Sequence, residues 1–109
     1  MEHFAVGVVG TDYVGLATGA CLAYVGHSVT CLDNDQERLA GLRKGRVPFY
    51  EPRLEELIAK SAGRLHFAGS QRLAEIVREV DVLFVAVGTP QGGDGSADLS
   101  NVANVARAL

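Results

Sequence analysis

The chain has 109 residues, of which 48% are hydrophobic and 21% charged, the balance of an ordinary globular domain with one modest core. Its net charge of -3 and sequence pI of about 5.5 argue against a surface that binds nucleic acid or anionic membranes. No apolar run approaches the ~18 residues of a membrane-spanning helix. The first residues lack the pattern of a signal peptide, so we expect a cytoplasmic protein.

The first part of the chain alternates between strand and helix patterns. Residues 4–9 form a short apolar run rich in valine, which is typical of a buried parallel strand. Residues 14–25 are rich in alanine and leucine and predict a helix that ends at Gly26. Residues 28–32 predict a second strand, directly followed by Asp33.

Two further helices are predicted before the third strand. Residues 35–44 indicate one helix, and the basic residues 43–46 are expected to form its solvated end rather than a phosphate patch. Apolar residues within 54–58 are spaced as on one face of another helix. Residues 65–68 then predict a brief third strand.

The last part of the chain repeats this alternation. Residues 73–80 predict a fourth helix, and residues 81–87 carry the strongest buried-strand pattern of the chain. Residues 91–97 hold three glycines and indicate a loop. Asp98 or Ser100 is expected to cap a last helix.

Strands that alternate with helices imply a parallel sheet with right-handed crossovers. We therefore predict an α/β fold of the Rossmann type, with strand order 3-2-1-4 and flanking helices. In this order the ends of the first and fourth strands lie side by side, where such sheets bind ligands. We expect residues 1–109 to form one N-terminal dinucleotide-binding domain whose sheet is truncated before it is complete, which would leave an edge at residues 82–87 for self-association.

The turn after the first strand follows the dinucleotide pattern G-x-G-x-x-G with one change. Gly10 permits the tight turn and Gly15 permits close packing of helix and strand, while Asp12 stands where the second glycine would be. The start of the helix offers backbone N–H groups and partial positive charge to a pyrophosphate. Because Asp12 adds bulk and negative charge there, we expect it to weaken dinucleotide binding, unless its side chain points to solvent or caps the helix.

Asp33 ends the second strand, at the position where a carboxylate accepts both hydroxyl groups of the adenosine ribose. A carboxylate there would repel a 2′-phosphate, so the sequence predicts NAD rather than NADP. The alternative is a turn aspartate that caps the next helix.

The cysteines and histidines carry no catalytic or metal-binding pattern. Cys21 and Cys31 both fall inside apolar patterns, so we expect buried free thiols in a reducing compartment. The histidines are expected to be core or surface residues: His3, His27 and His66. We predict no metal site and no catalytic residue in this chain.

Five segments together resemble the UDP-glucose/GDP-mannose dehydrogenase family. They run in family order across nearly the whole chain: residues 10–16, 26–33, 50–52, 86–90 and 94–99. The most specific are Tyr50-Glu51-Pro52 and the later run Val87-Gly88-Thr89-Pro90. The resemblance is greatest to the UDP-glucose branch, although the GDP-mannose and UDP-N-acetylmannosamine branches are close relatives. This chain departs from the family at Asp12 and at Arg53, which replaces a glycine.

The resemblance implies a set of cofactor-binding residues. The set includes the residues of the glycine turn and Asp33, and its members are Gly10, Thr11, Asp12, Tyr13, Val14, Gly15, Asp33, Arg38, Val87, Gly88 and Thr89. The backbone of residues 11–14 would hold the pyrophosphate, Arg38 would lie beside the adenosine, and residues 87–89 would line the cofactor. A plain surface charge at Arg38 and a turn residue at Thr89 are the alternatives.

The resemblance also implies the reaction of the full enzyme. The family oxidises the C6 alcohol of the sugar to a carboxylate in two hydride transfers to NAD, through a thiohemiacetal on a cysteine that lies in a later part of its chain. For the full UDP-glucose enzyme this implies oxidation of UDP-glucose with two NAD to UDP-glucuronate and two NADH. Neither Cys21 nor Cys31 matches that cysteine. We therefore expect this chain alone to be inactive and the UDP-sugar to be a partner only of the full enzyme. The alternatives are a dehydrogenase of another nucleotide sugar and a non-catalytic nucleotide-sensing module.

Overall fold

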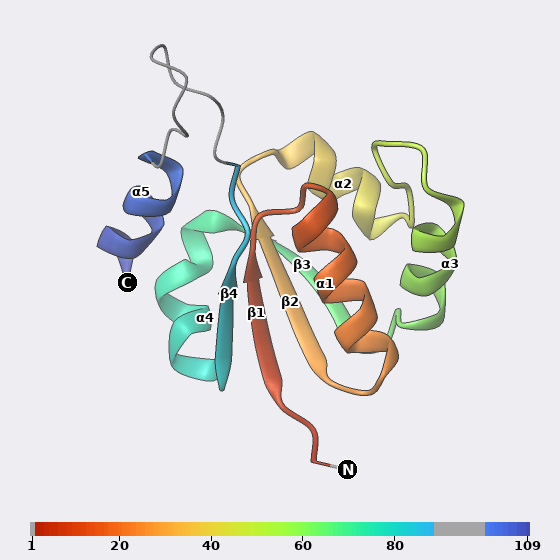
Figure 1. Cartoon of the computed structure of the whole chain (residues 1–109), viewed down its shortest axis with the longest axis horizontal. Coiled ribbons are helices and arrows are strands. Elements are labelled where there is room, and N and C mark those ends of the chain that lie inside the picture. The colour runs from red at the N-terminus through yellow and green to blue at the C-terminus, as the bar shows by residue number, and fades with distance from the viewer. Residues whose placement is uncertain (1, 89–99) are drawn as a thin grey trace.

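The computed structural model describes residues 2–88 and 100–109. Four parallel strands form one sheet in the order β3-β2-β1-β4, which confirms the predicted order (Figure 1). The strands are β1 (Ala5–Val9), β2 (Ser28–Asp33), β3 (Leu65–Gly69) and β4 (Val82–Val85). Because the strands are parallel, their carboxyl ends lie at one edge of the sheet, at the top of Figure 1.

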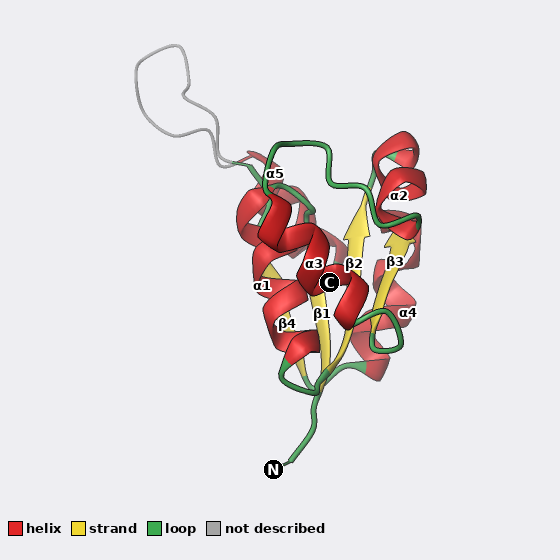
Figure 2. Cartoon of the chain, turned by 90° about the vertical axis from the view of Figure 1, so that its right-hand side faces the viewer, coloured by secondary structure: helices red, strands yellow, loops and turns green. Residues whose placement is uncertain are grey.

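Helices cover both faces of the sheet, and Figure 2 shows α1 and α4 on opposite sides. The helices are α1 (Tyr13–Tyr24), α2 (Gln36–Arg43), α3 (Pro52–Lys60), α4 (Leu73–Glu79) and α5 (Ser100–Ala108), with a 3-10 turn η1 (Ser70–Arg72) before α4. All five helices that the sequence predicts are present. Their ends differ from the predicted ends by a few residues at most, as the termini of helices commonly do.

Side chains alternate between the two faces of each strand and so form two clusters. The larger cluster contains apolar residues of the sheet together with residues of α1, α2 and α3, whereas the smaller one lies under α4. Small residues let α1 approach the sheet closely. A side-chain carbon added at Gly19 of α1 would lie only 2.6 Å from the sulfur of Cys31 on β2.

The two cysteines differ in burial. Cys31 is fully buried, as predicted, but Cys21 is exposed, so the prediction that both are buried was wrong for Cys21. The buried residues of α1 are Gly15, Leu16, Gly19, Ala20 and Ala23, and Cys21 is not among them. An apolar helix with many small residues gives little periodic signal, which is why the sequence did not separate the two positions.

Strand β4 is present but more exposed than its sequence predicts. Val82, Phe84 and Val85 are 42%, 41% and 42% exposed, so the expectation of a buried strand was wrong for the residues that the structure describes. The strand lies at the end of the sheet and pairs with β1. A continuous apolar run indicates that a strand is suited to burial on both faces. It does not show which other elements of the chain pack against the strand, and these decide whether the strand is buried.

At the other edge of the sheet, a side chain bonds to one carbonyl oxygen of β3. The guanidinium group of Arg43, the last residue of α2, donates hydrogen bonds of 3.3 and 3.0 Å to the carbonyl oxygen of Phe67 on β3. Gly45 follows with a φ of 82°, a conformation that favours glycine after a helix end.

In the parts of the chain that the structure describes, no helix is long and apolar enough to cross a membrane.

Candidate cofactor-binding site

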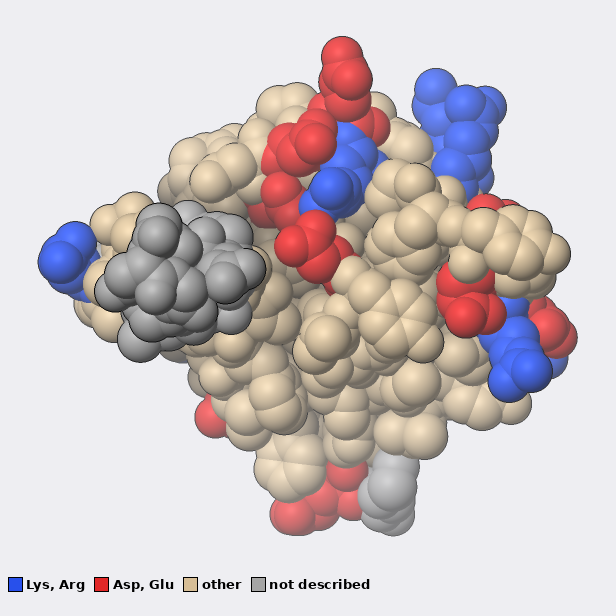
Figure 3. All heavy atoms as spheres, turned by 45° about the horizontal axis from the view of Figure 1, so that its top comes forward, with Lys and Arg blue, Asp and Glu red and all other residues tan. Residues whose placement is uncertain are grey.

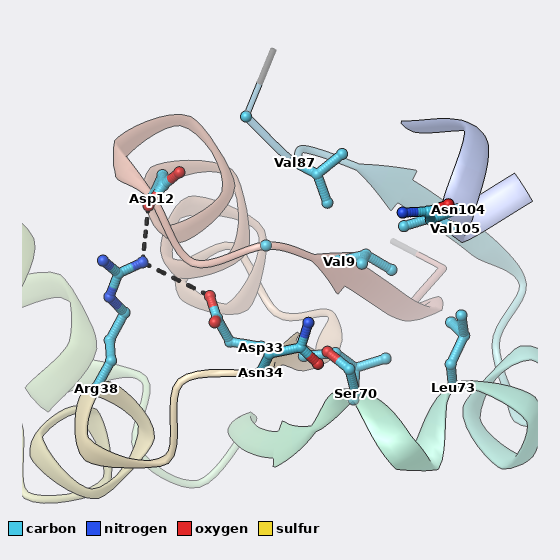
Figure 4. Close-up of a pocket in the computed structure, with 13 residues that line it drawn as sticks. Val9, Asp12, Asp33, Asn34, Arg38, Ser70, Leu73, Val87, Asn104 and Val105 are labelled. Carbon is cyan, nitrogen blue, oxygen red and sulfur yellow. Dashed lines mark hydrogen bonds and ion pairs between the residues drawn. The ribbon is translucent and has the colours of Figure 1, made fainter. Parts of the chain in front are cut away.

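A cleft of about 390 Å³ opens at the carboxyl ends of the strands (Figure 4). Its walls come from the ends of β1 and β2, the residues after β4, and the helices α2, α4 and α5. The lining residues are Val9, Gly10, Asp12, Leu32, Asp33, Asn34, Arg38, Ser70, Leu73, Val87, Gly88, Asn104 and Val105. The cleft lies between β1 and its two neighbours, at the switch point where open parallel sheets bind ligands.

The floor of the cleft is a backbone crossing that only glycine fits. Gly10 has a φ of 105°, and a side-chain carbon there would meet the carbonyl oxygen of Ala86 and lie 2.9 Å from its carbonyl carbon. A side-chain carbon at Gly15 would meet the carbonyl oxygen of Gly10. Both glycines therefore have the roles that the turn pattern predicts, and β1, α1 and the end of β4 meet without intervening side chains.

Helix α1 begins beside this crossing. Asp12 is the residue before its first turn, and its carbonyl oxygen accepts the N–H of Leu16 at 2.9 Å. The backbone N–H groups at the start of a helix have no partner within the helix, and they carry its partial positive charge. The first turn starts at Tyr13, whose ring lies 5.7 Å from the ring of Phe49. An anion beside this turn would meet backbone donors.

Asp33 is the most heavily bonded acidic side chain of the cleft. One carboxylate oxygen accepts the backbone N–H of Thr11 at 2.9 Å and the Thr11 hydroxyl at 2.5 Å. The other oxygen accepts the N–H of Asp35 at 2.9 Å. Thr11 is fully buried, so it joins the glycine turn to the end of β2. The sequence assigned Thr11 a backbone role and missed this side-chain role.

The surroundings of Asp33 favour its charged form. Partial burial by itself raises the pKa of this carboxyl group. The hydrogen bonds from the Thr11 hydroxyl and from the N–H groups of Asp35 and Thr11, together with the nearby charge of Arg38, outweigh that effect and lower the pKa below its ordinary value. A charged carboxylate accepts hydrogen bonds but donates none, which suits the recognition of hydroxyl groups.

Arg38 lies between two carboxylates at the mouth of the cleft. Its Nη1 atom is 2.7 Å from Asp12 Oδ1 and 3.7 Å from Asp33 Oδ2 (Figure 4). Figure 3 shows acidic side chains gathered around a basic one on this side of the molecule. The side chain of Asp12 is 62% exposed and makes no capping hydrogen bond with α1. Neither alternative for Asp12 describes it fully, because it faces solvent and is also paired with Arg38.

The segment Tyr50-Glu51-Pro52 starts α3. Glu51 accepts the backbone N–H of Arg53 at 3.2 Å, and Pro52 occupies the first turn, where its missing N–H group costs nothing. Arg53 enters this helix in a regular conformation, so the loss of a glycine at this position is compatible with the fold.

The structure brings most of the predicted cofactor residues together. Those that line the cleft are Gly10, Asp12, Asp33, Arg38, Val87 and Gly88. Thr11, Tyr13, Val14 and Gly15 support the turn and the start of α1 beside it, and Thr89 lies outside the described residues. Sequence reasoning missed Asn34, Ser70 and Asn104. Asn34 and Ser70 follow the ends of β2 and β3, so the rule that parallel strand ends meet at one edge would have found them.

The thiols and histidines take no part in this cleft. Burial raises the pKa of the Cys31 thiol to about 12, which keeps it protonated and unreactive at neutral pH. His27 accepts the N–H of Phe4 at the opposite end of β1. Among residues 2–88 and 100–109, no group of three or more His, Cys, Asp or Glu side chains could hold a metal ion.

The sheet order, the glycine crossing and Asp33 define a Rossmann domain built to bind a dinucleotide. Residues 4–109 match the UDP-glucose/GDP-mannose dehydrogenase family, NAD binding domain. The chain belongs to this family, and NAD is the cofactor of the domain that it matches.

Relatives support the same conclusion. The chain is 51% identical over 104 residues to UDP-glucose 6-dehydrogenase of Pseudomonas aeruginosa, a match that covers 94% of this chain and 22% of that protein. A UDP-glucose dehydrogenase structure from Pyrobaculum islandicum superposes with a TM-score of 0.90 at 40% identity, over 98% of this chain and 25% of that one. A GDP-mannose dehydrogenase from Pseudomonas aeruginosa gives a TM-score of 0.84 at 33% identity, over 94% and 23%. The chain thus spans about a quarter or less of each of these relatives.

Proposed function

We propose that this chain holds NAD for a longer protein that oxidises the C6 alcohol of UDP-glucose, with the adenosine ribose on Asp33 and the pyrophosphate at the start of α1. The observation that carries the proposal is Asp33, which the turn itself holds in place at the end of β2. A carboxylate offers about four lone-pair positions, and three hydrogen bonds are formed here, so it can accept a further hydroxyl group.

The remaining residues fit the same cofactor. Gly10 lets the backbone of β1 and the end of β4 meet beside the first turn of α1, where a pyrophosphate would meet backbone N–H groups. Arg38 lies beside the adenosine end, while Val87 and Gly88 line the path toward the nicotinamide. When bound, NAD supplies the hydride acceptor. The residues of this chain bind and orient it, and the groups that act on the sugar belong to the longer protein.

Three broader statements belong to the same proposal. Residues 1–109 form the first part of a domain whose sheet continues beyond β4 in the longer protein, because three of the four residues of that strand, Val82, Phe84 and Val85, are more than 40% exposed. The same edge lets the chain self-associate. The free cysteines favour a reducing compartment, and the cytoplasm as its location.

The test compares NAD binding by the wild-type chain, Asp33→Asn and Asp81→Asn in a calorimetric titration. Asp81 is the matched control because its carboxylate also accepts a backbone N–H, that of Ala5 at 2.9 Å, but at the opposite end of the sheet. We expect Asp33→Asn to lose about tenfold or more in affinity, since hydrogen bonds to charged groups contribute roughly 1.5–3 kcal/mol. Asp81→Asn should bind NAD as the wild type does. Equal affinity for all three proteins would contradict the assignment of Asp33.

The substrate is tested on the longer protein. It should reduce NAD with UDP-glucose and much more slowly with GDP-mannose or UDP-N-acetylmannosamine. A preference for either of the other two sugars would place the protein in another branch of the family, without affecting the NAD site.

A further inference from the structure

We propose that Asp12 is a specificity-determining residue: it engages the Arg38 guanidinium and thereby keeps this cation from serving a 2′-phosphate, which strengthens the preference for NAD over NADP. This inference rests on the proposed function, since it assumes that the adenosine ribose lies on Asp33. It assigns a positive role to a residue that departs from the glycine pattern.

The first step concerns where a 2′-phosphate would lie. A ribose held by the Asp33 carboxylate has its 2′ oxygen at that carboxylate, so a phosphate on this oxygen would be a close neighbour of Arg38, whose Nη1 atom is 3.7 Å from Asp33 Oδ2. Arginine close to the ribose is the usual means by which Rossmann domains accommodate this phosphate. Arg38 therefore has the chemistry and the position to favour NADP.

The second step concerns how Arg38 is occupied. Its shortest contact is the 2.7 Å ion pair with Asp12, and the longer contact with Asp33 completes a bridge across the mouth of the cleft (Figure 4). Arg38 is only 28% exposed, whereas Asp12 is 62% exposed. A phosphate would have to compete with the Asp12 carboxylate for the guanidinium group and would also approach two negative charges. Asp33 acts against NADP directly, and Asp12 acts by holding Arg38.

The third step separates Asp12 from a general charge effect. Glu37 is also an exposed acidic residue in the first turn of α2, next to Arg38 in sequence. Adjacent positions on a helix point to different sides, so Glu37 contributes negative charge near the cleft without facing the Arg38 side chain. Removal of the Glu37 carboxylate therefore changes the net charge by the same amount as removal of the Asp12 carboxylate, and it leaves the bridge between Asp12, Arg38 and Asp33 intact.

The experiment measures the ratio of the dissociation constants for NADP and NAD in four proteins: wild type, Asp12→Asn, Glu37→Gln and the double variant Asp12→Asn with Arg38→Gln. We expect the ratio to fall about fivefold in Asp12→Asn, the equivalent of an exposed ion pair of roughly 1 kcal/mol. NAD should remain the tighter ligand because Asp33 is unchanged. The ratio should stay at the wild-type value in Glu37→Gln. In the double variant the fivefold fall should disappear, because the guanidinium group that would bind the 2′-phosphate is absent.

The outcomes are distinct. An unchanged ratio in Asp12→Asn, with NAD still bound, overturns the inference alone. The same fall in Glu37→Gln, or a fall that persists in the double variant, also overturns it, because the effect would then not pass through Arg38. Failure of the wild type to bind NAD overturns the proposed function and the inference together. Asp12→Ser repeats the first arm with a residue that is favoured before a helix, in case the asparagine variant folds poorly.

Discussion

The substitution Gly15→Ala tests the backbone crossing beneath the cleft. Gly15 lies in the first turn of α1, and its added methyl group would meet the carbonyl oxygen of Gly10 and lie 3.3 Å from the side chain of Ala86. The first of these neighbours is backbone, which has no rotamer to change, so α1 must move away from the sheet to accept the methyl group. Gly63 is the matched control, because it has a φ outside the left-handed region and no atom within 4 Å of an added carbon.

The magnitude follows from two opposed effects. Alanine is favoured over glycine inside a helix by about 1 kcal/mol. Overpacking of a tight site costs about 1–3 kcal/mol, and a backbone neighbour places Gly15 at or above the upper end of that range. We expect Gly15→Ala to lower the free energy of unfolding by about 2 kcal/mol. For Gly63→Ala we expect no loss, and a gain of up to about 1 kcal/mol from the reduced freedom of the unfolded chain.

Urea denaturation followed by far-ultraviolet circular dichroism measures both free energies of unfolding, with equal slopes required for a valid comparison. The NAD affinity of Gly15→Ala should fall as well, because the displaced helix carries the first-turn N–H groups. If Gly15→Ala unfolds within about 0.5 kcal/mol of the wild type, the range of ordinary surface substitutions, and binds NAD normally, the crossing is not tight and our reasoning about the turn is wrong.

Three further predictions concern acid, assembly and turnover. The pKa of Asp33 is lowered in the folded chain, so the stability it contributes is present above about pH 4 and is lost as the pH falls through the folded value. The difference in unfolding free energy between the wild type and Asp33→Asn should therefore shrink from pH 6 to pH 2, and a constant difference would argue against this linkage. Sedimentation should show self-association that Phe84→Lys weakens, because the lysine places a charge on the exposed edge strand, whereas the same change at exposed Gln71 should have no effect. The purified chain with NAD and UDP-glucose should produce no NADH above a protein-free control, and turnover free of contaminating enzyme would refute this.

Patterns local to one element predicted the larger part of the fold. Valine-rich runs, glycines after helices and the spacing of the turn were enough for the strand order and for the placement of Gly10 and Asp33. Each of these signals depends on a few neighbouring residues and on the handedness of the crossover connections.

The features that the sequence did not predict depend on contacts between distant elements. The pairing of Asp12 with Arg38 joins the start of α1 to α2, and no spacing rule connects the two positions. The exposure of Cys21 depends on which side of an apolar helix meets the sheet. Asn104 of α5 lines the cleft. The position of α5 depends on its packing against the smaller apolar cluster, through Val105, rather than on a local sequence pattern.

The contact of Arg43 with β3 makes the two edge strands of the sheet different. A strand edge is a row of donors and acceptors to which another strand can add, but on β3 the carbonyl oxygen of Phe67 already accepts a guanidinium group from the same chain. A strand that added beside β3 would have to displace the Arg43 guanidinium group from this carbonyl oxygen and would also lie close to its positive charge. The four side chains of β4 are all apolar, and three of them, including that of Phe84, are exposed. If the sheet continues in the longer protein, as we propose, the next strand would therefore add beside β4, and the cleft beside β1 would then lie in the middle of the enlarged sheet.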